Sequence, residues 1–174
     1  MSYTIEDLTS IDDGIFDTLW GESFARIESG GTMPWSKYEF AYGRGLSDNE
    51  KKTAFKDIFT EACADYDDRK LYLCRKDGTP IRMFSASKSG GVAVCHYTLY
   101  GPDALGSRAW LYDPIVLRQT RDQLTADFGV SGHTIHVMTG SPMHTYYLAR
   151  PNSNEHSLTE TQADGVSTIT FTYN

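Results

Sequence analysis

Two histidines lie where a side chain could exchange a proton with a bound molecule. His96 falls in the apolar, β-branched run Val92–Leu99, and His136 falls in the strand-like run Thr134–Thr139. Imidazole changes charge near neutral pH, so either residue could act as a general base. A histidine in a central strand is, however, more often a hydrogen-bonded core residue than a catalytic one. No carboxylate lies on Val92–Leu99, so His96 is the first candidate base and His136 the second.

Other reactive sites have less support. His133, His136 and His144 are close in sequence, but we expect them in a turn, a strand and a helix without a carboxylate neighbour, which argues against a metal site. The chain contains no Walker loop, GxGxxG or GxSxG motif. The three cysteines include no CxxC pair and are expected to be buried free thiols: Cys63, Cys74 and Cys95.

A loop of small residues, Gly101–Ala109, follows the strand that carries His96. A helix-like run, Asp113–Phe128, comes next; it opens with Asp113 and Pro114 and stops at Gly129. A strand, a loop and a helix in this order can direct backbone N–H groups and the helix dipole toward an anionic group.

Four helices are expected from apolar residues at helical spacing and from capping signals. Ser10 is the expected N-cap of the first. Ser47 and Glu50 have the spacing of a capping box at the start of the second. The third is the helix after the small-residue loop, and the fourth is expected from Pro142 to about Ala149.

Seven runs have strand character, and the Asp-Gly pairs at 77–78 and 164–165 predict two tight hairpins. In the fourth run, simple alternation places Val94 and Thr98 on one face of the sheet and Leu99 on the other. The runs are Tyr3–Ile5, Leu71–Arg75, Ile81–Ala86, Val92–Leu99, Thr134–Thr139, Ser157–Thr161 and Thr168–Tyr173.

Length and composition predict a single globular domain spanning residues 1–174. The chain has 174 residues, 40% of them hydrophobic, with a net charge of −7 and a pI near 5.1. An acidic chain is not expected to bind nucleic acid or an anionic membrane, since both need clustered Lys and Arg. No signal peptide or membrane span is recognisable, so a cytoplasmic location is expected.

The order β, α, α, β, β, β, α, β, α, β, β resembles the GCN5-related N-acetyltransferase (GNAT) fold over nearly the whole chain. The resemblance implies an α+β fold with a mostly antiparallel, mixed sheet of about seven strands flanked by four helices. In that family the fourth and fifth strands splay apart and acyl-coenzyme A lies in the gap. Its pantetheine pairs with the fourth strand, and its pyrophosphate meets N–H groups of the loop before the third helix.

The resemblance also implies site residues. The nearest match to the family's loop, Arg/Gln-x-x-Gly-x-Gly/Ala, is Asp103-Ala-Leu-Gly-Ser-Arg108, in which Gly106 fits and Arg108 could bind a phosphate through two N–H groups. Tyr147, in preference to Tyr146, takes the place of the tyrosine that protonates the leaving thiolate, and His96 would be the base. The implied cofactor-binding residues are Leu99, Tyr100, Gly106, Ser107, Arg108 and Ala109.

Two functions follow from these expectations. The first is an acyl-CoA-dependent N-acyltransferase, with acetyl-CoA as co-substrate and a small-molecule or peptide amine as acceptor. The second is a non-catalytic binding or assembly module on the same scaffold, which Asp103 favours because it stands where the family has Arg or Gln. Neither nucleic acid nor a membrane is an expected partner, and the oligomeric state, a homodimer included, stays open.

Overall fold

A computed structural model describes residues 2–28, 46–65, 67–100, 114–140, 144–145, 148 and 156–174. These residues form one sheet of seven strands in the order β1-β2-β3-β4-β5-β7-β6, in which β4 and β5 are the parallel pair. In chain order the elements are β1 (Tyr3–Leu8), α1 (Asp13–Glu28), α3 (Asp48–Ala64), β2 (Arg69–Lys76), β3 (Thr79–Ser89), β4 (Val92–Tyr100), α5 (Pro114–Phe128), β5 (Gly132–Met138), β6 (His156–Ala163) and β7 (Val166–Tyr173).

The expected α+β class and mostly antiparallel sheet are confirmed. Three helices lie in the described residues; the fourth expected helix, Pro142 to about Ala149, is described only at residues 144–145 and 148, which are helical. None of the described helices is both long enough and apolar enough to cross a bilayer.

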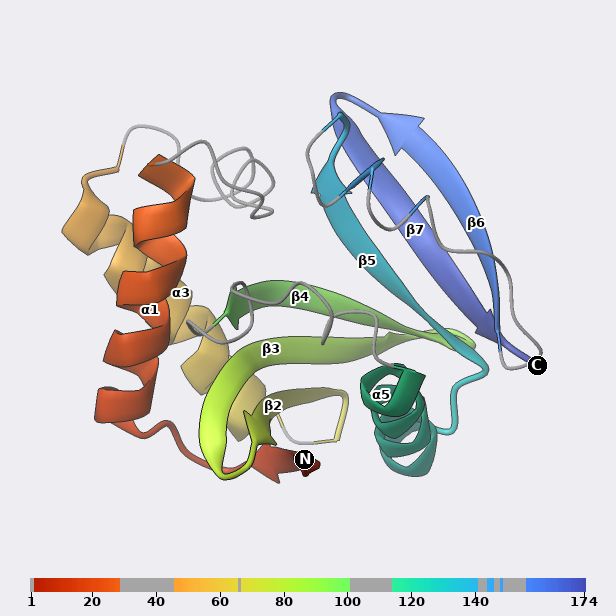
Figure 1. Cartoon of the computed structure of the whole chain (residues 1–174), viewed down its shortest axis with the longest axis horizontal. Coiled ribbons are helices and arrows are strands. Elements are labelled where there is room, and N and C mark those ends of the chain that lie inside the picture. The colour runs from red at the N-terminus through yellow and green to blue at the C-terminus, as the bar shows by residue number, and fades with distance from the viewer. Residues whose placement is uncertain are drawn as a thin grey trace.

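Helices cover both faces of the sheet. α1 and α3 lie side by side (left in Figure 1) and pack on β2, β3 and β4. The rings of Phe16 in α1 and Phe59 in α3 meet edge to face, with their centroids 6.1 Å apart. α5 lies against β1 and β5, and the buried Tyr72 of β2 donates a hydrogen bond to Asp127 of α5 over 2.7 Å. Because side chains alternate along β2, Leu71 and Leu73 face away from α5.

The start of α3 is as predicted, and the start of α1 is not. The Ser47 hydroxyl accepts a bond from the Glu50 N–H, and the Glu50 carboxylate accepts one from the Ser47 N–H, which completes the capping box. At α1 the predicted cap, Ser10, is wrong. Asp12 caps the helix, because its carboxylate accepts the Ile15 N–H over 2.9 Å.

Both predicted hairpins are confirmed. Their central residues have positive φ, at 48° and 83° for Asp77 and Gly78 and at 53° and 76° for Asp164 and Gly165. Positive φ at both central positions is the conformation that joins two twisted strands with two residues. The strands extend one to three residues beyond most of the predicted runs.

A β-bulge interrupts β4. Ser85 of β3 pairs with His96, and Phe84 pairs with Thr98, so Tyr97 is the extra residue on β4. A bulge of this kind bends the strand and increases its twist.

The bulge overturns the predicted alternation along β4. Val94 pairs with Ser87 of β3, and Leu99 pairs with Met83 of β3. Ser87 and Met83 are four residues apart and so lie on the same face of the sheet, which puts their partners Val94 and Leu99 on that face as well. Thr98 therefore faces the opposite way from Val94. Simple alternation failed here because one inserted residue shifts every later side chain to the other face.

Candidate functional site

The sheet opens between β4 and β5. The two strands pair only at Ala93 with His133 and at Val94 with Thr134. β4 then continues along β3 to Tyr100, and β5 continues along β7 to Met138, so the two strands diverge (Figure 1). The predicted separation of the fourth and fifth strands is therefore confirmed. Beyond the two pairs, the facing edges of β4 and β5 have no strand partner among the described residues.

Short backbone contacts fix the apex of this opening. The Ser131 N–H donates to the Gly91 carbonyl over 2.9 Å, and the Tyr173 N–H donates to the Ser131 carbonyl over 2.8 Å. At Gly132 an added Cβ would lie 2.5 Å from the Phe171 carbonyl oxygen. The start of β5 is thus held against both the β3–β4 turn and the end of β7, in a position that needs glycine.

Three of the predicted site residues lie on the part of β4 that has separated from β5. His96 comes two residues after Val94, Leu99 is fully buried, and Tyr100 is the last residue of the strand. Five others lie outside the described residues: Gly106, Ser107, Arg108, Ala109 and Tyr147.

His136 occupies the matching position on β5. It comes two residues after Thr134, as His96 comes two residues after Val94, so the backbone register places the two histidine positions on either side of the opening. The half-buried His136 ring has its Nδ1 3.0 Å from the Thr168 hydroxyl of β7. That contact orients the ring.

His133 is structural. The residue is 5% exposed, its ring stacks on Phe171, and its Nδ1 lies 2.7 Å from the Tyr173 hydroxyl. Burial, together with the nearby positive charge of Arg82, lowers the pKa of His133 to about 3. A ring that stays neutral over the physiological range and lies away from solvent is a poor proton carrier. It was expected in a turn, and it lies in β5.

The three cysteines are free, as predicted, but Cys63 is only partly buried, where burial was expected. Cys74 and Cys95 are buried, and burial raises their pKa values to about 11 and about 12. The thiolate is the reactive form of cysteine, so neither residue is suited to act as a nucleophile.

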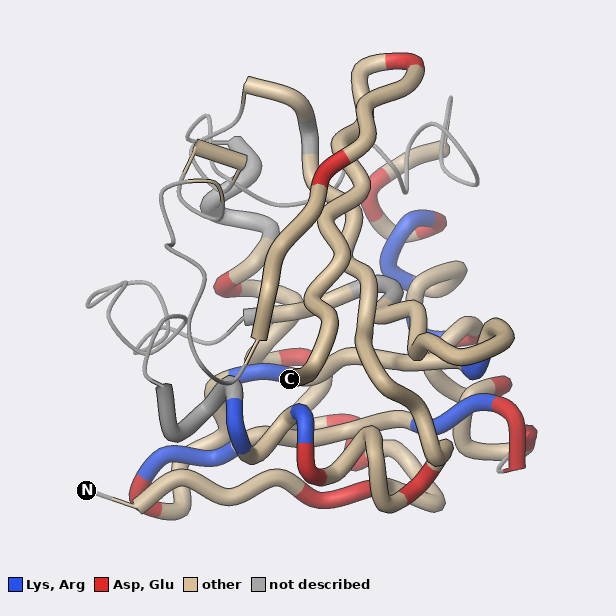
Figure 2. Tube along the Cα trace, turned by 90° about the vertical axis from the view of Figure 1, so that its right-hand side faces the viewer, with Lys and Arg blue, Asp and Glu red and all other residues tan. Residues whose placement is uncertain are grey.

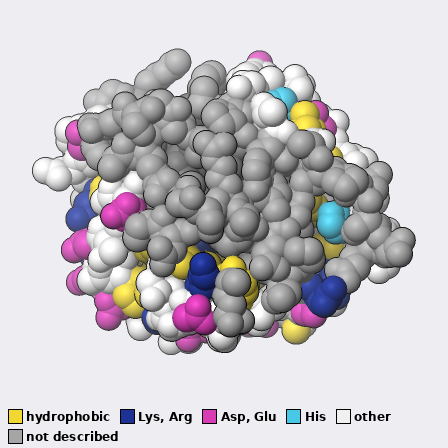
Figure 3. All heavy atoms as spheres, viewed as in Figure 1, with side chains coloured by type: hydrophobic (Ala, Val, Ile, Leu, Met, Phe, Trp, Pro, Cys, Tyr) yellow, Lys and Arg dark blue, Asp and Glu magenta, His cyan; other side chains and the backbone are white. Residues whose placement is uncertain are grey.

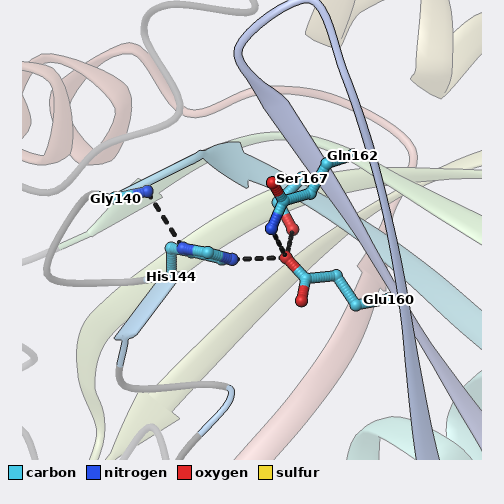
Figure 4. A network of polar contacts seen from close by, with 5 residues as sticks. All are labelled: Gly140, His144, Glu160, Gln162 and Ser167. Atoms are coloured by element: carbon cyan, nitrogen blue, oxygen red, sulfur yellow. Dashed lines mark hydrogen bonds and ion pairs between the residues drawn. The ribbon is translucent and has the colours of Figure 1, made fainter.

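A polar network joins the segment after β5 to the β6–β7 hairpin (Figure 4). The His144 Nδ1 accepts the Gly140 N–H over 2.9 Å, and the His144 Nε2 contacts Oε1 of Glu160. The same oxygen accepts a bond from the Ser167 hydroxyl and another, at 2.8 Å, from the Gln162 amide. These donors lower the pKa of Glu160 to about 2, with the Ser167 bond contributing most.

Sequence reasoning missed this network. His144 was expected to have no carboxylate neighbour, and Glu160 overturns that expectation. The hairpin pattern placed Glu160 in a predicted strand, but Ser167 lies one residue before the predicted start of the next strand at Thr168 and belongs to β7 in the structure. Their approach to His144, 16 residues before Glu160, is a contact between segments far apart in the sequence, which no local signal reports.

Charge is distributed unevenly over the molecule. Strands β5, β6 and β7 contain no Lys or Arg, and Glu160 is their only acidic residue. Figure 2 shows the described basic residues on the rest of the molecule. In Figure 3, histidine side chains reach the surface on the right of the face, where Figure 1 places these three strands. Glu160 is therefore balanced by neutral hydrogen-bond donors and one imidazole, not by a cationic side chain of these strands.

No protein-family model matches the sequence, and no curated protein matches it either. Solved structures do. The chain is similar to the PaiA N-acetyltransferase of Thermoplasma acidophilum in complex with coenzyme A, with a TM-score of 0.60, 12% identity, and 99% and 100% of the two chains covered. It is also similar to the spermidine N-acetyltransferase of Vibrio cholerae in complex with CoA and spermine, with a TM-score of 0.57, 12% identity, and 98% and 95% covered.

A third similar structure is the Salmonella typhimurium acetyl transferase that modifies the N-terminal serine of the ribosomal protein L7/L12. Its TM-score is 0.59 at 9% identity, with 98% of this chain and 93% of that chain covered. At these identities the similarity establishes the fold.

Proposed function

We propose that this chain, which has the fold of the GCN5-related N-acetyltransferases, is an acyl-CoA-dependent N-acyltransferase that uses acetyl-CoA as co-substrate. The observation that carries the proposal is the parting of β4 and β5 after two residue pairs. It leaves the backbone edge of β4 without a strand partner among the described residues, and an amide-containing chain such as pantetheine can pair with an edge of that kind.

The residues on that edge fit the proposed ligand. Leu99 and Tyr100 would offer backbone N–H and C=O groups to pantetheine, and Gly106, Ser107, Arg108 and Ala109 would hold the pyrophosphate ahead of α5. Two solved structures of similar fold are complexes with coenzyme A. Coenzyme A supplies the acyl group as a thioester.

Transfer needs a base and an acid. His96 or His136 would take a proton from the acceptor's ammonium group, so that its nitrogen can form the new C–N bond as the C–S bond breaks. Tyr147 would give its proton to the departing thiolate. The acidic limb of the pH profile of kcat/KM reports protonation of the base. It should disappear in one of the two variants, His96→Gln or His136→Gln, and that variant identifies the base. If the limb stays in both variants, neither histidine is the base.

The acceptor is proposed to be a primary amine, on a small molecule or at a peptide terminus. Structures of similar fold include an enzyme bound to spermine and one that modifies an N-terminal serine. The net charge of −7 favours a cationic acceptor.

Calorimetric titration tests cofactor binding. We expect acetyl-CoA and desulfo-CoA to bind with micromolar affinity, and Arg108→Ala to weaken binding at least about tenfold, because it removes charge-assisted bonds to phosphate. Absence of heat at millimolar ligand would rule out the enzyme. Binding without thiol release over a panel of amines would instead support the second candidate, a non-catalytic module, for which Asp103 in the phosphate loop is the supporting observation.

A further inference from the structure

The His144–Glu160 network has a defined pattern of protons. Because the Gly140 N–H donates to His144 Nδ1, that nitrogen must carry a lone pair, and the proton of the neutral ring must lie on Nε2. Nε2 therefore donates to Glu160. Both ring nitrogens are engaged, so the ring is fixed in orientation as well as in tautomer.

Glu160 is an anchored anion. One of its oxygens receives donors from three side chains: His144, Gln162 and Ser167. Ser167 is fully buried on β7, and His144 is 8% exposed. Hydrogen bonds to the charged form keep the pKa of Glu160 near 2, so the carboxylate is ionised throughout the range in which an enzyme of this kind would work.

These contacts do not form a nucleophilic triad. The Ser167 hydroxyl donates to the carboxylate, and Figure 4 shows no hydrogen bond between Ser167 and the imidazole. It is also buried, so it cannot reach a substrate. The cluster instead joins three separate pieces of chain: the turn after β5, the short helical stretch at His144, and the β6–β7 hairpin.

The cluster holds His144, which lies shortly before the proposed acid in the sequence. Residues 144–145 and 148 are helical, and Tyr147 lies between them in sequence, three positions after His144. Through Gly140 the same ring is tied to the end of β5, the strand that forms one side of the opening. Since β5, β6 and β7 contain no Lys or Arg, no cation of these strands can replace the imidazole as partner of Glu160.

We propose that Glu160 is a positioning residue which, through His144, fixes the segment bearing Tyr147 relative to the opening between β4 and β5. This inference rests on the proposed function. Glu160 does not touch substrate; its charge and hydrogen bonds orient His144, and His144 orients the helical stretch. A displacement of about 1 Å in a catalytic group can cost about a hundredfold in rate, so loss of the anchor should reduce kcat.

A double-mutant cycle tests the link to Tyr147. We expect Glu160→Gln to lower kcat by about 10- to 100-fold, with the KM for acetyl-CoA changed less than about twofold. In a Tyr147→Phe background the same substitution should change kcat less than about twofold, because the group it positions is gone. Glu61→Gln, a matched change at the exposed Glu61–Arg69 ion pair, should leave kcat unchanged. An equal loss in both backgrounds would overturn the proposal.

Two further variants guard against a fold defect. His144→Gln keeps an N–H that can reach Glu160 and should retain most of the activity, whereas His144→Leu should lose as much as Glu160→Gln. Equal losses in both His144 variants would overturn the assigned role of the Nε2–H bond.

Amide hydrogen exchange separates failure of this inference from failure of the proposed function, because it needs no turnover. Peptides covering residues 140–148 should exchange at least about tenfold faster in Glu160→Gln, while peptides of β2 and β3 stay as in the wild type. Unchanged exchange in residues 140–148 would overturn the anchor even in an active enzyme. Faster exchange in a protein that binds no coenzyme A would support the anchor and refute the proposed function.

Discussion

His133 gives the protein a pH-dependent stability that can be measured at the scale of one residue. The folded state holds the pKa of His133 at about 3, against 6.5 for an ordinary histidine, so below pH 6.5 the unfolded chain binds a proton that the folded chain does not. The stabilising contribution is complete above pH 6.5 and is lost as the pH falls toward 3. Between pH 6.5 and 5 the free energy of unfolding should drop by up to about 1.4 kcal/mol per pH unit.

Urea unfolding at pH 7, 6 and 5 measures that slope. His133→Asn can still hydrogen-bond the Tyr173 hydroxyl but cannot take up a proton, so its stability should vary less over this interval. Equal slopes in wild type and variant would show that another group is responsible. The interval stays above the range in which most carboxylates titrate, Glu160 included.

At the scale of an element, side-chain hydrogen bonds attach α5 to the sheet: the buried Tyr72 hydroxyl donates to Asp127, and the Gln119 amide donates to the Tyr3 carbonyl over 2.7 Å. Burial and the Asp127 carboxylate raise the pKa of Tyr72, so its hydroxyl keeps the proton that it donates. Tyr72→Phe should reduce the free energy of unfolding by about 1–3 kcal/mol, as measured by denaturant titration. Gln123→Ala should cost less, because Asp127 then keeps its bond from Tyr72. A larger loss in Gln123→Ala would contradict this ranking.

Elements whose signals are local in sequence could be predicted. The capping box at Ser47 and Glu50 and the Asp-Gly hairpins each depend on residues within a few positions of one another. The first cap was misplaced because Ser10 and Asp12 are both good caps and lie two residues apart. The β4 bulge at Tyr97 left no trace, since the apolar alternation runs through it unbroken.

The site could be predicted only in part, for the same reason. The position of the opening was implied by the resemblance to the GNAT fold, and His96 and His136 were candidates because they fall in the fourth and fifth predicted strands. The Glu160 network and the burial of His133 depend on contacts between segments far apart in the chain. Such contacts are fixed by tertiary packing and are not encoded in spacing.

At the scale of the whole molecule, the apex at Gly132 determines how the two parts of the sheet meet. In Gly132→Ala the new methyl group would lie 2.5 Å from the Phe171 carbonyl oxygen. Gly132 and Phe171 both belong to the paired backbone of β5 and β7, so neither can move aside without disturbing that pairing. The variant should lose about 1–3 kcal/mol of stability in thermal or urea unfolding. Gly21→Ala is the matched control: it has open space in a helix and should gain up to about 1 kcal/mol. A neutral Gly132→Ala would contradict the close packing at the apex.

The small number of residue pairs between β4 and β5 also affects how the protein unfolds. Strands β5, β7 and β6 form a three-stranded unit, in which they pair with one another along most of their length. Among the described residues, they pair with the other four strands only at the two residue pairs between β4 and β5. Heating should therefore release this unit before the rest melts. An extended ligand bound between β4 and β5 would add backbone hydrogen bonds across the opening. The liganded protein should then unfold in a single step, whereas the free protein should unfold in two.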